Sequence, residues 1–95
     1  MADWALTVQE LNEYVRKRLA GDPMLRGVRV RGEISGFRPH YSGHRYFILK
    51  DEASRINCVM FRQDNLGIQF AVRDGMAVVL SGSVSIYTKD GAYQF

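Results

Sequence analysis

The chain has 95 residues, of which 46% are apolar and 24% are charged, and its formal net charge is +3. This length allows one domain with one modest hydrophobic core, and the composition excludes a chain that is disordered throughout. No apolar run reaches the roughly 20 residues that span a bilayer, and the N-terminal residues lack the order of a secretory signal, so we expect a cytoplasmic protein that does not engage a membrane.

The positive charge is concentrated in the middle of the chain. The net charge is −1 over residues 1–25, +5 over residues 26–62 and −1 over residues 63–95. An anionic ligand would require such a basic segment, although a solvated basic face gives the same count. The single cysteine, Cys58, lies in an apolar run and cannot form an internal disulfide, so we expect it to be a small buried core residue.

The first predicted element is an α-helix that begins after Thr7. Thr7 and Glu10 have the spacing of a capping box, and apolar residues then recur at helical spacing as far as Leu19. Gly21 and Pro23 provide the signal for the end of the helix. We expect residues 1–24 to form a helix packed on a barrel, and residues 25–95 to form the barrel itself as the binding domain.

Five stretches with the alternation of a β-strand follow the helix, at residues 28–34, 45–50, 55–61, 76–87 and 92–95. The second and third form a predicted hairpin, and the last is so brief that we expect a truncated strand. Gly32 and Gly82 interrupt two strands, where glycine commonly marks a bulge or a bend. Residues 62–72 lack clean alternation and predict a loop with a short helix.

The order of these elements predicts a mainly β protein preceded by an N-terminal α-helix. It suits the OB-fold, a five-stranded, partly open Greek-key barrel, although periodicity alone also allows another small five-stranded barrel. The ligand of an OB-fold usually lies on strands 2 and 3 and on the loops between strands 1 and 2 and between strands 4 and 5. The stretch between the first two predicted strands is therefore the first candidate for a ligand-binding site.

That stretch, GFRPHYSGHRYF at residues 36–47, interleaves aromatic and basic side chains. Single-stranded nucleic acid suits both, because each base gains roughly 1–3 kcal/mol by stacking on a ring and the phosphates attract cations. The ring of Phe37 could stack on a base in the same way or plug the mouth of the barrel. The candidate nucleic-acid-binding residues are Arg38, His40, Tyr41, His44, Arg45, Tyr46, Lys50, Arg55, Phe61, Arg62 and Tyr87.

The residues do not indicate a catalytic or metal site. His40 and His44 are four residues apart, but Gly43 favours a loop, and no cysteine or carboxylate lies beside them to complete a metal site. The adjacent carboxylates of Asp51 and Glu52 fit a solvated turn better than a general acid and base, because neighbours in a turn do not converge on one substrate atom. We expect no catalytic residue, no metal and no cofactor.

A family resemblance covers nearly the whole chain. It is carried by LTVQELN at residues 6–12, VRGEIS at 30–35, SGHRYFILKD at 42–51, INCVMFR at 56–62 and GSVSIY at 82–87, with residues 74–75 and 93–94. On these motifs the chain resembles the N-terminal domain of the large subunit of exodeoxyribonuclease VII. The resemblance implies an OB-fold that binds single-stranded DNA for an enzyme that degrades it from its ends, while the catalytic domain and the region that carries the small subunits lie elsewhere.

Other interpretations remain open from the residues. An RNA-binding OB domain of the anticodon-binding type would share the hairpin, and stacking alone does not separate RNA from DNA without a contact to the 2′-hydroxyl. A protein-interaction module would carry its charge incidentally, and its binding would not depend on salt. A truncated last strand would leave unpaired backbone groups, which predicts a homodimer or a strand swap.

Overall fold

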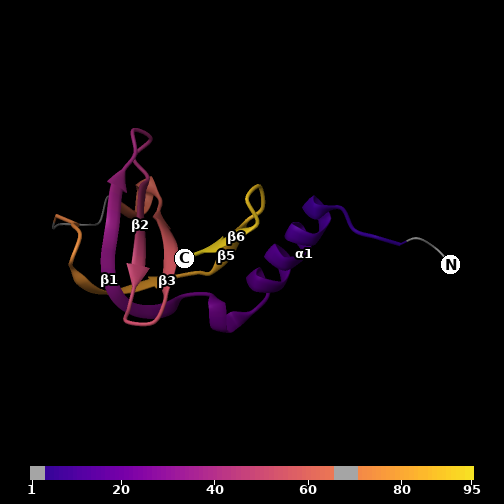
Figure 1. Ribbon diagram of the computed structural model, residues 1–95, viewed down its shortest axis with the longest axis horizontal. Helices are drawn as coiled ribbons and strands as arrows, with labels where there is room; N and C mark the ends of the chain where they lie inside the picture. The colour runs from indigo at the N-terminus through magenta and orange to yellow at the C-terminus, as the bar shows by residue number, and fades with distance from the viewer. Residues whose placement is uncertain (1–3, 66–70) are drawn as a thin grey trace.

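The computed structural model describes residues 4–65 and 71–95. Its elements in chain order are α1 (Val8–Ala20), the 3-10 helix η1 (Pro23–Leu25), β1 (Val28–Pro39), β2 (Arg45–Lys50), β3 (Arg55–Met60), α2 (Arg62–Asn65), β4 (Ala77–Gly82), β5 (Ser85–Tyr87) and β6 (Ala92–Gln94). Figure 1 shows β1, β2 and β3 gathered at one end of the molecule, with β5 and β6 extending from them toward α1. The predicted mainly β fold with an N-terminal helix is confirmed.

The strands form two hydrogen-bonded sheets. The larger is antiparallel with the order β3-β2-β1-β4, and the smaller pairs β5 with β6. Phe95, directly after β6, donates its backbone N–H to the carbonyl of Asn57 at 2.9 Å and accepts from the N–H of Val59 at 3.0 Å. These two bonds flank Cys58 in the pattern of a parallel bridge, so the strands close into a ring between Phe95 and β3.

The fourth predicted strand is divided in two. β4 ends at Gly82 and β5 begins at Ser85, and between them the backbone N–H of Val84 donates to the carbonyl of Leu25 at 3.0 Å. The strand therefore leaves the ladder with β1 at this point and turns toward η1. The predicted short helix is α2, which has one turn, while residues 66–70 of the same predicted segment lie outside the described residues.

β1 continues five residues beyond its predicted end at position 34. Its register against β2 shifts between Ser35 and Arg38, and Gly36 within this bulge has a φ of 60°. Glycine adopts this left-handed conformation without a steric penalty, which lets the strand resume as far as Pro39. The bulge thus lies at Gly36, whereas Gly32, where the sequence predicted one, stays in regular register opposite Val78. The loop before β2 shrinks to residues 40–44.

Within residues 4–65 and 71–95, the buried core consists of Ile34, Phe47, Leu49 and Cys58, each at most 4% exposed. Phe47 and Leu49 alternate with outward-facing residues along β2, as the sequence predicts, and Cys58 lies opposite Phe47 on β3. Partly buried side chains surround them: Val30, Phe37, Ile56, Met60, Val72, Met76, Val78, Leu80 and Phe95.

The thiol of Cys58 should be nearly inert in the folded protein. Burial raises the pKa of this thiol from its ordinary 9.0 to about 11, so the reactive thiolate should be about 100-fold scarcer near pH 8 than in the unfolded chain. We expect slow labelling by a disulfide reagent in buffer and fast labelling in denaturant. Because the folded thiol keeps its proton to higher pH, its contribution to stability is complete below pH 9 and disappears as the pH rises toward 11. Equal labelling rates in buffer and in denaturant would contradict the predicted protection of the thiol.

α1 begins with the predicted capping box and packs beside the smaller sheet. The Thr7 hydroxyl accepts from the N–H of Glu10 at 3.1 Å, and the Glu10 carboxylate accepts from the N–H of Thr7 at 2.8 Å, which lowers the pKa of that carboxyl. The Asn12 side chain donates to the carbonyl of Thr88 at 2.9 Å, and the helix contacts β5. No residue of α1 is buried. None of the helices in residues 4–65 and 71–95 combines the length and the apolar character that a bilayer crossing requires.

Candidate nucleic-acid interface

The outward face of the β2–β3 hairpin carries both rings and cations. Tyr46 and Lys50 alternate with the buried residues of β2, and in the ladder Tyr46 lies opposite Val59 while Lys50 lies opposite Arg55. Arg38 on β1 lies opposite Tyr46 on its other side. The antiparallel register therefore places Arg38 beside the exposed ring of Tyr46 at one end of the face. At the other end it pairs Lys50 with Arg55.

Loop 40–44 is closed by its own hydrogen bonds. The backbone N–H of His40 donates to the carbonyl of His44, and that of Gly43 donates to the carbonyl of His40, both at 2.9 Å. Nδ1 of His40 lies 2.8 Å from the Ser42 hydroxyl. Gly43 has a φ of 92°, a backbone conformation that residues with a Cβ rarely adopt. This short, internally bonded loop holds its aromatic side chains in defined places.

Three rings at the loop form what we call the ring cluster: His40, Tyr41 and Tyr46. The centroids of His40 and Tyr41 are 4.2 Å apart with the planes at 34°, and His40 meets Tyr46 edge-on at 5.9 Å. Tyr41 is 97% exposed. Its flat face is therefore open to solvent, where a nucleic-acid base could stack on it.

A second group of predicted residues meets on the other side of the loop. His44 meets Phe61 edge-on, with centroids 5.5 Å apart and the planes at 88°. The Arg62 side chain passes over Gly43, where an added Cβ would lie 2.9 Å from the Arg62 Cγ. Phe61 is nearly half exposed. Loop 40–44 thus brings residues that are 18 positions apart in the sequence into one small region.

Two of the predicted residues lie elsewhere. Arg45 points to the core side of β2, because it alternates with Tyr46, and its guanidinium lies 5.8 Å from the ring centroid of Phe37. Phe37 packs on Phe47 at 6.5 Å, beside the buried core. Tyr87 belongs to β5 in the smaller sheet, opposite Ala92. Neither Arg45 nor Tyr87 is part of the outward face of β2 and β3.

The far end of the face is built around a turn. The Asp51 carboxylate accepts from the backbone N–H groups of Ala53 and Ser54 at 2.9 and 2.8 Å, which lowers the pKa of this carboxyl. The carboxylate therefore closes the turn. Lys50 also approaches Glu33 at 3.8 Å, but both side chains are about half exposed, and such surface pairs contribute little.

Sequence reasoning left out two cations on the same sheet. Arg29 and Arg31 are exposed on β1, opposite Ser81 and Val79 of β4. Both arginines alternate with valine in VRVR, which gives them a common direction, but this alternation does not show that the face of β1 continues the face of β2. Together with Arg38 they add positive charge to the outer face of β1, where the exposed Glu33 lies between Arg31 and Arg38.

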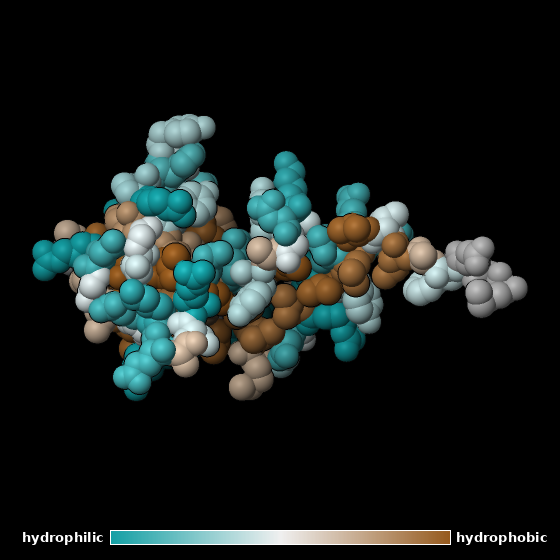
Figure 2. Space-filling view, viewed as in Figure 1, coloured by the Kyte–Doolittle hydropathy of each residue, from teal (hydrophilic) through white to brown (hydrophobic). Residues whose placement is uncertain are grey.

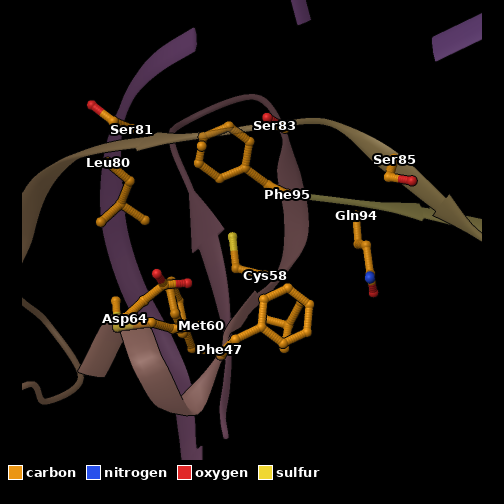
Figure 3. Close-up of a pocket in the computed structure, with 13 residues that line it drawn as sticks. Phe47, Cys58, Met60, Asp64, Leu80, Ser81, Ser83, Ser85, Gln94 and Phe95 are labelled. Carbon is orange, nitrogen blue, oxygen red and sulfur yellow. The ribbon is translucent and has the colours of Figure 1, made fainter. Parts of the chain in front are cut away.

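A groove of about 680 Å³ lies between β3 and β4, and Phe61 is among the residues that line it. Its walls include Cys58, Met60 and Leu80 from the core, and Figure 3 shows Phe95 beside Leu80 and Ser83 at one side of it. Its lining is mainly apolar and carries no cation, so it does not suit a phosphate chain. In residues 4–65 and 71–95, no three histidine, cysteine or carboxylate side chains gather in a way that could hold a metal ion.

A family model described as "OB-fold nucleic acid binding domain" matches residues 6–95, which confirms the predicted fold class. The chain belongs to this family of OB-fold nucleic-acid-binding domains. It is also similar to exodeoxyribonuclease 7 large subunits, as the motifs predicted. It is 50% identical over 90 residues to that of Clostridium novyi (strain NT), 51% over 89 residues to that of Clostridium botulinum (strain Loch Maree / Type A3), and 49% over 90 residues to that of Alkaliphilus oremlandii (strain OhILAs).

These alignments cover 95%, 94% and 95% of the chain and 22% of each relative. The chain thus spans about a fifth of the length of the curated relatives that it matches.

Proposed function

We propose that this chain is the part of a bacterial exodeoxyribonuclease VII large subunit that binds single-stranded DNA in the cytoplasm and guides it to a catalytic domain outside these 95 residues. One observation carries the proposal. Exposed rings and cations lie together around loop 40–44: Tyr46 is opposite Arg38 on the outward face of the sheet, and Phe61 and Arg62 follow the end of β3, where Phe61 meets His44 of the loop. The similarity to large subunits of that enzyme supports the choice of DNA.

The chemistry of the face fits an unpaired strand. Bases of a single strand expose their flat faces and can stack on Tyr41, Tyr46 and Phe61, whereas a duplex keeps these faces covered. The phosphates between them would meet Arg38 and Arg62, and Lys50 and Arg55 would continue the path toward the turn at residues 51–54. Neither contact reads a base edge, so we expect little sequence preference.

The two parts of the chain have different roles in this proposal. We assign strand binding to residues 25–95 and a bracing role to residues 1–24, because Asn12 of α1 holds the carbonyl of Thr88 in the β5–β6 hairpin. We expect the small subunits to bind parts of the large subunit outside this chain. β4 is the outer strand of the larger sheet at the end away from β3, and its edge could pair with a second copy, which light scattering at high concentration would detect.

Binding to labelled single-stranded DNA, followed by fluorescence anisotropy at several salt concentrations, tests the proposal. Replacing Arg38, Arg55 and Arg62 together by glutamine should flatten the dependence of log affinity on log salt by about 2, since each phosphate contact to a single strand contributes about 0.7. Arg18→Gln on α1 is the matched control and should leave the slope unchanged.

A duplex and an RNA of the same sequence serve as competitors in this measurement. We expect both to compete poorly. Better competition by RNA would favour the anticodon-binding type of OB domain, and binding without salt dependence would favour a protein-interaction module.

A further inference from the structure

Loop 40–44 is tied to the start of α2 by the side chain of His44. The Nδ1 atom of this imidazole accepts a hydrogen bond from the backbone N–H of Arg62 at 2.9 Å. Arg62 is the first residue of α2, and the first N–H groups of a helix have no partner within the helix. The ring of His44 therefore supplies an acceptor that the helix itself lacks.

The bond lies where the ladder between β2 and β3 ends. The last pair of the ladder at this end is Arg45 with Met60. The next residue outward is His44, just before β2, on one strand and Phe61, just after β3, on the other. In place of another backbone pair, the imidazole packs edge-on against Phe61 and binds the amide of Arg62. The Arg62 side chain in turn crosses the backbone of the loop at Gly43. The loop and the corner between β3 and α2 are thus joined by three separate contacts.

We propose that His44 is a positioning residue for strand binding: its neutral imidazole latches loop 40–44 to α2 and so fixes Phe61 and Arg62 relative to the ring cluster. This role deepens the proposed function and rests on it. A nitrogen that accepts carries no proton, so the ring holds its proton on Nε2, and an imidazolium, which can only donate, does not make this bond. In this role His44 holds Phe61 and Arg62 in position, whereas the sequence predicted that His44 itself contacts the nucleic acid.

Two substitutions separate the acceptor from the ring. His44→Asn places an amide oxygen near the position of Nδ1 and removes the ring, whereas His44→Phe keeps a ring against Phe61 and removes the acceptor. We expect His44→Asn to bind a labelled single-stranded DNA within about twofold of the wild-type affinity, and His44→Phe to bind about fivefold more weakly, as for the loss of one hydrogen bond. Wild-type affinity in His44→Phe, or weaker binding by His44→Asn than by His44→Phe, would overturn the proposal.

Hydrogen exchange of the Arg62 amide, measured by NMR without DNA, tests the latch separately from the proposed function. This amide should exchange about fivefold faster in His44→Phe than in the wild type and stay protected in His44→Asn. Equal exchange in the wild type and His44→Phe overturns the latch, whatever the DNA does. If the wild type binds no single-stranded DNA, the proposed function fails and the role of His44 in binding fails with it, while the exchange rates still decide whether the latch exists.

Discussion

Replacing Tyr41 and Tyr46 together by alanine should weaken binding of single-stranded DNA by at least about 30-fold, because each base that stacks on an aromatic side chain gains roughly 1–3 kcal/mol. Tyr41 is almost fully exposed at the tip of loop 40–44, and Tyr46 lies on the outward face of β2. Figure 2 shows polar side chains over much of the strand region, where we expect DNA to bind, and a hydrophobic patch along α1. Fluorescence anisotropy with a mixed-sequence oligonucleotide measures the loss.

Two control variants make this result specific to stacking. The double substitution of the same tyrosines by phenylalanine keeps both rings and should bind within a fewfold of the wild type. Tyr14→Ala removes an exposed ring from α1, far along the chain from the loop, and should leave the affinity unchanged. Since neither Tyr41 nor Tyr46 is buried, thermal unfolding should change little. Unaltered DNA affinity in the alanine double variant would refute the ring cluster as a stacking platform.

Gly32→Ala should destabilise the barrel by about 1–3 kcal/mol, which is typical of overpacking a filled core. A Cβ added at Gly32 would lie 2.8 Å from the Cγ of the buried Leu49 and 2.8 Å from the backbone carbonyl oxygen of Lys50. The side chain of Leu49 has little room to move, and the carbonyl belongs to the adjacent strand β2. β1 and β2 would therefore have to separate, which weakens the sheet that carries the binding face.

Thermal unfolding followed by circular dichroism measures this effect, and we expect the midpoint to fall by at least about 4 °C for a domain of this size. Gly21→Ala is the matched control. Gly21 ends α1 with a φ of −83°, and the nearest atom to an added Cβ lies at an ordinary 3.4 Å. If Gly32→Ala melts at the wild-type temperature, the sheet is more adaptable at this point than its packing indicates.

Local features of the chain could be predicted because they depend on neighbours in sequence. The capping box of Thr7 and Glu10 needs only a spacing of three residues, and the structure contains both of its hydrogen bonds. Strict alternation likewise placed Phe47, Leu49 and Cys58 in the core and Tyr46 and Lys50 outside it. The motifs likewise pointed to the large subunits to which the chain is similar, because residues with these physical roles occur together in one order.

The extent of β1 could not be predicted in the same way. Gly36 and Pro39 in GFRP are typical of a loop, yet the bulge at Gly36 lets the strand continue beside β2. Pairing with β2 supplies the hydrogen bonds that decide between strand and loop, and local propensity does not include them. For the same reason the sequence predicted a bulge or a bend at Gly32. In the structure this position requires glycine because Leu49 on the next strand leaves no room for a Cβ.

The sequence by itself determined the mainly β class, the capped helix, the core of β2 and β3 and the kinds of side chain that a nucleic-acid strand would need, because these follow from periodicity and composition. Only the tertiary structure decided which candidates share a surface. It brought His44 to Arg62 across 18 positions, set the ring cluster beside Arg38, and placed Arg45 on the core side with Phe37. Strand register and the bulge fix these contacts, and both arise from pairing between segments distant in the sequence.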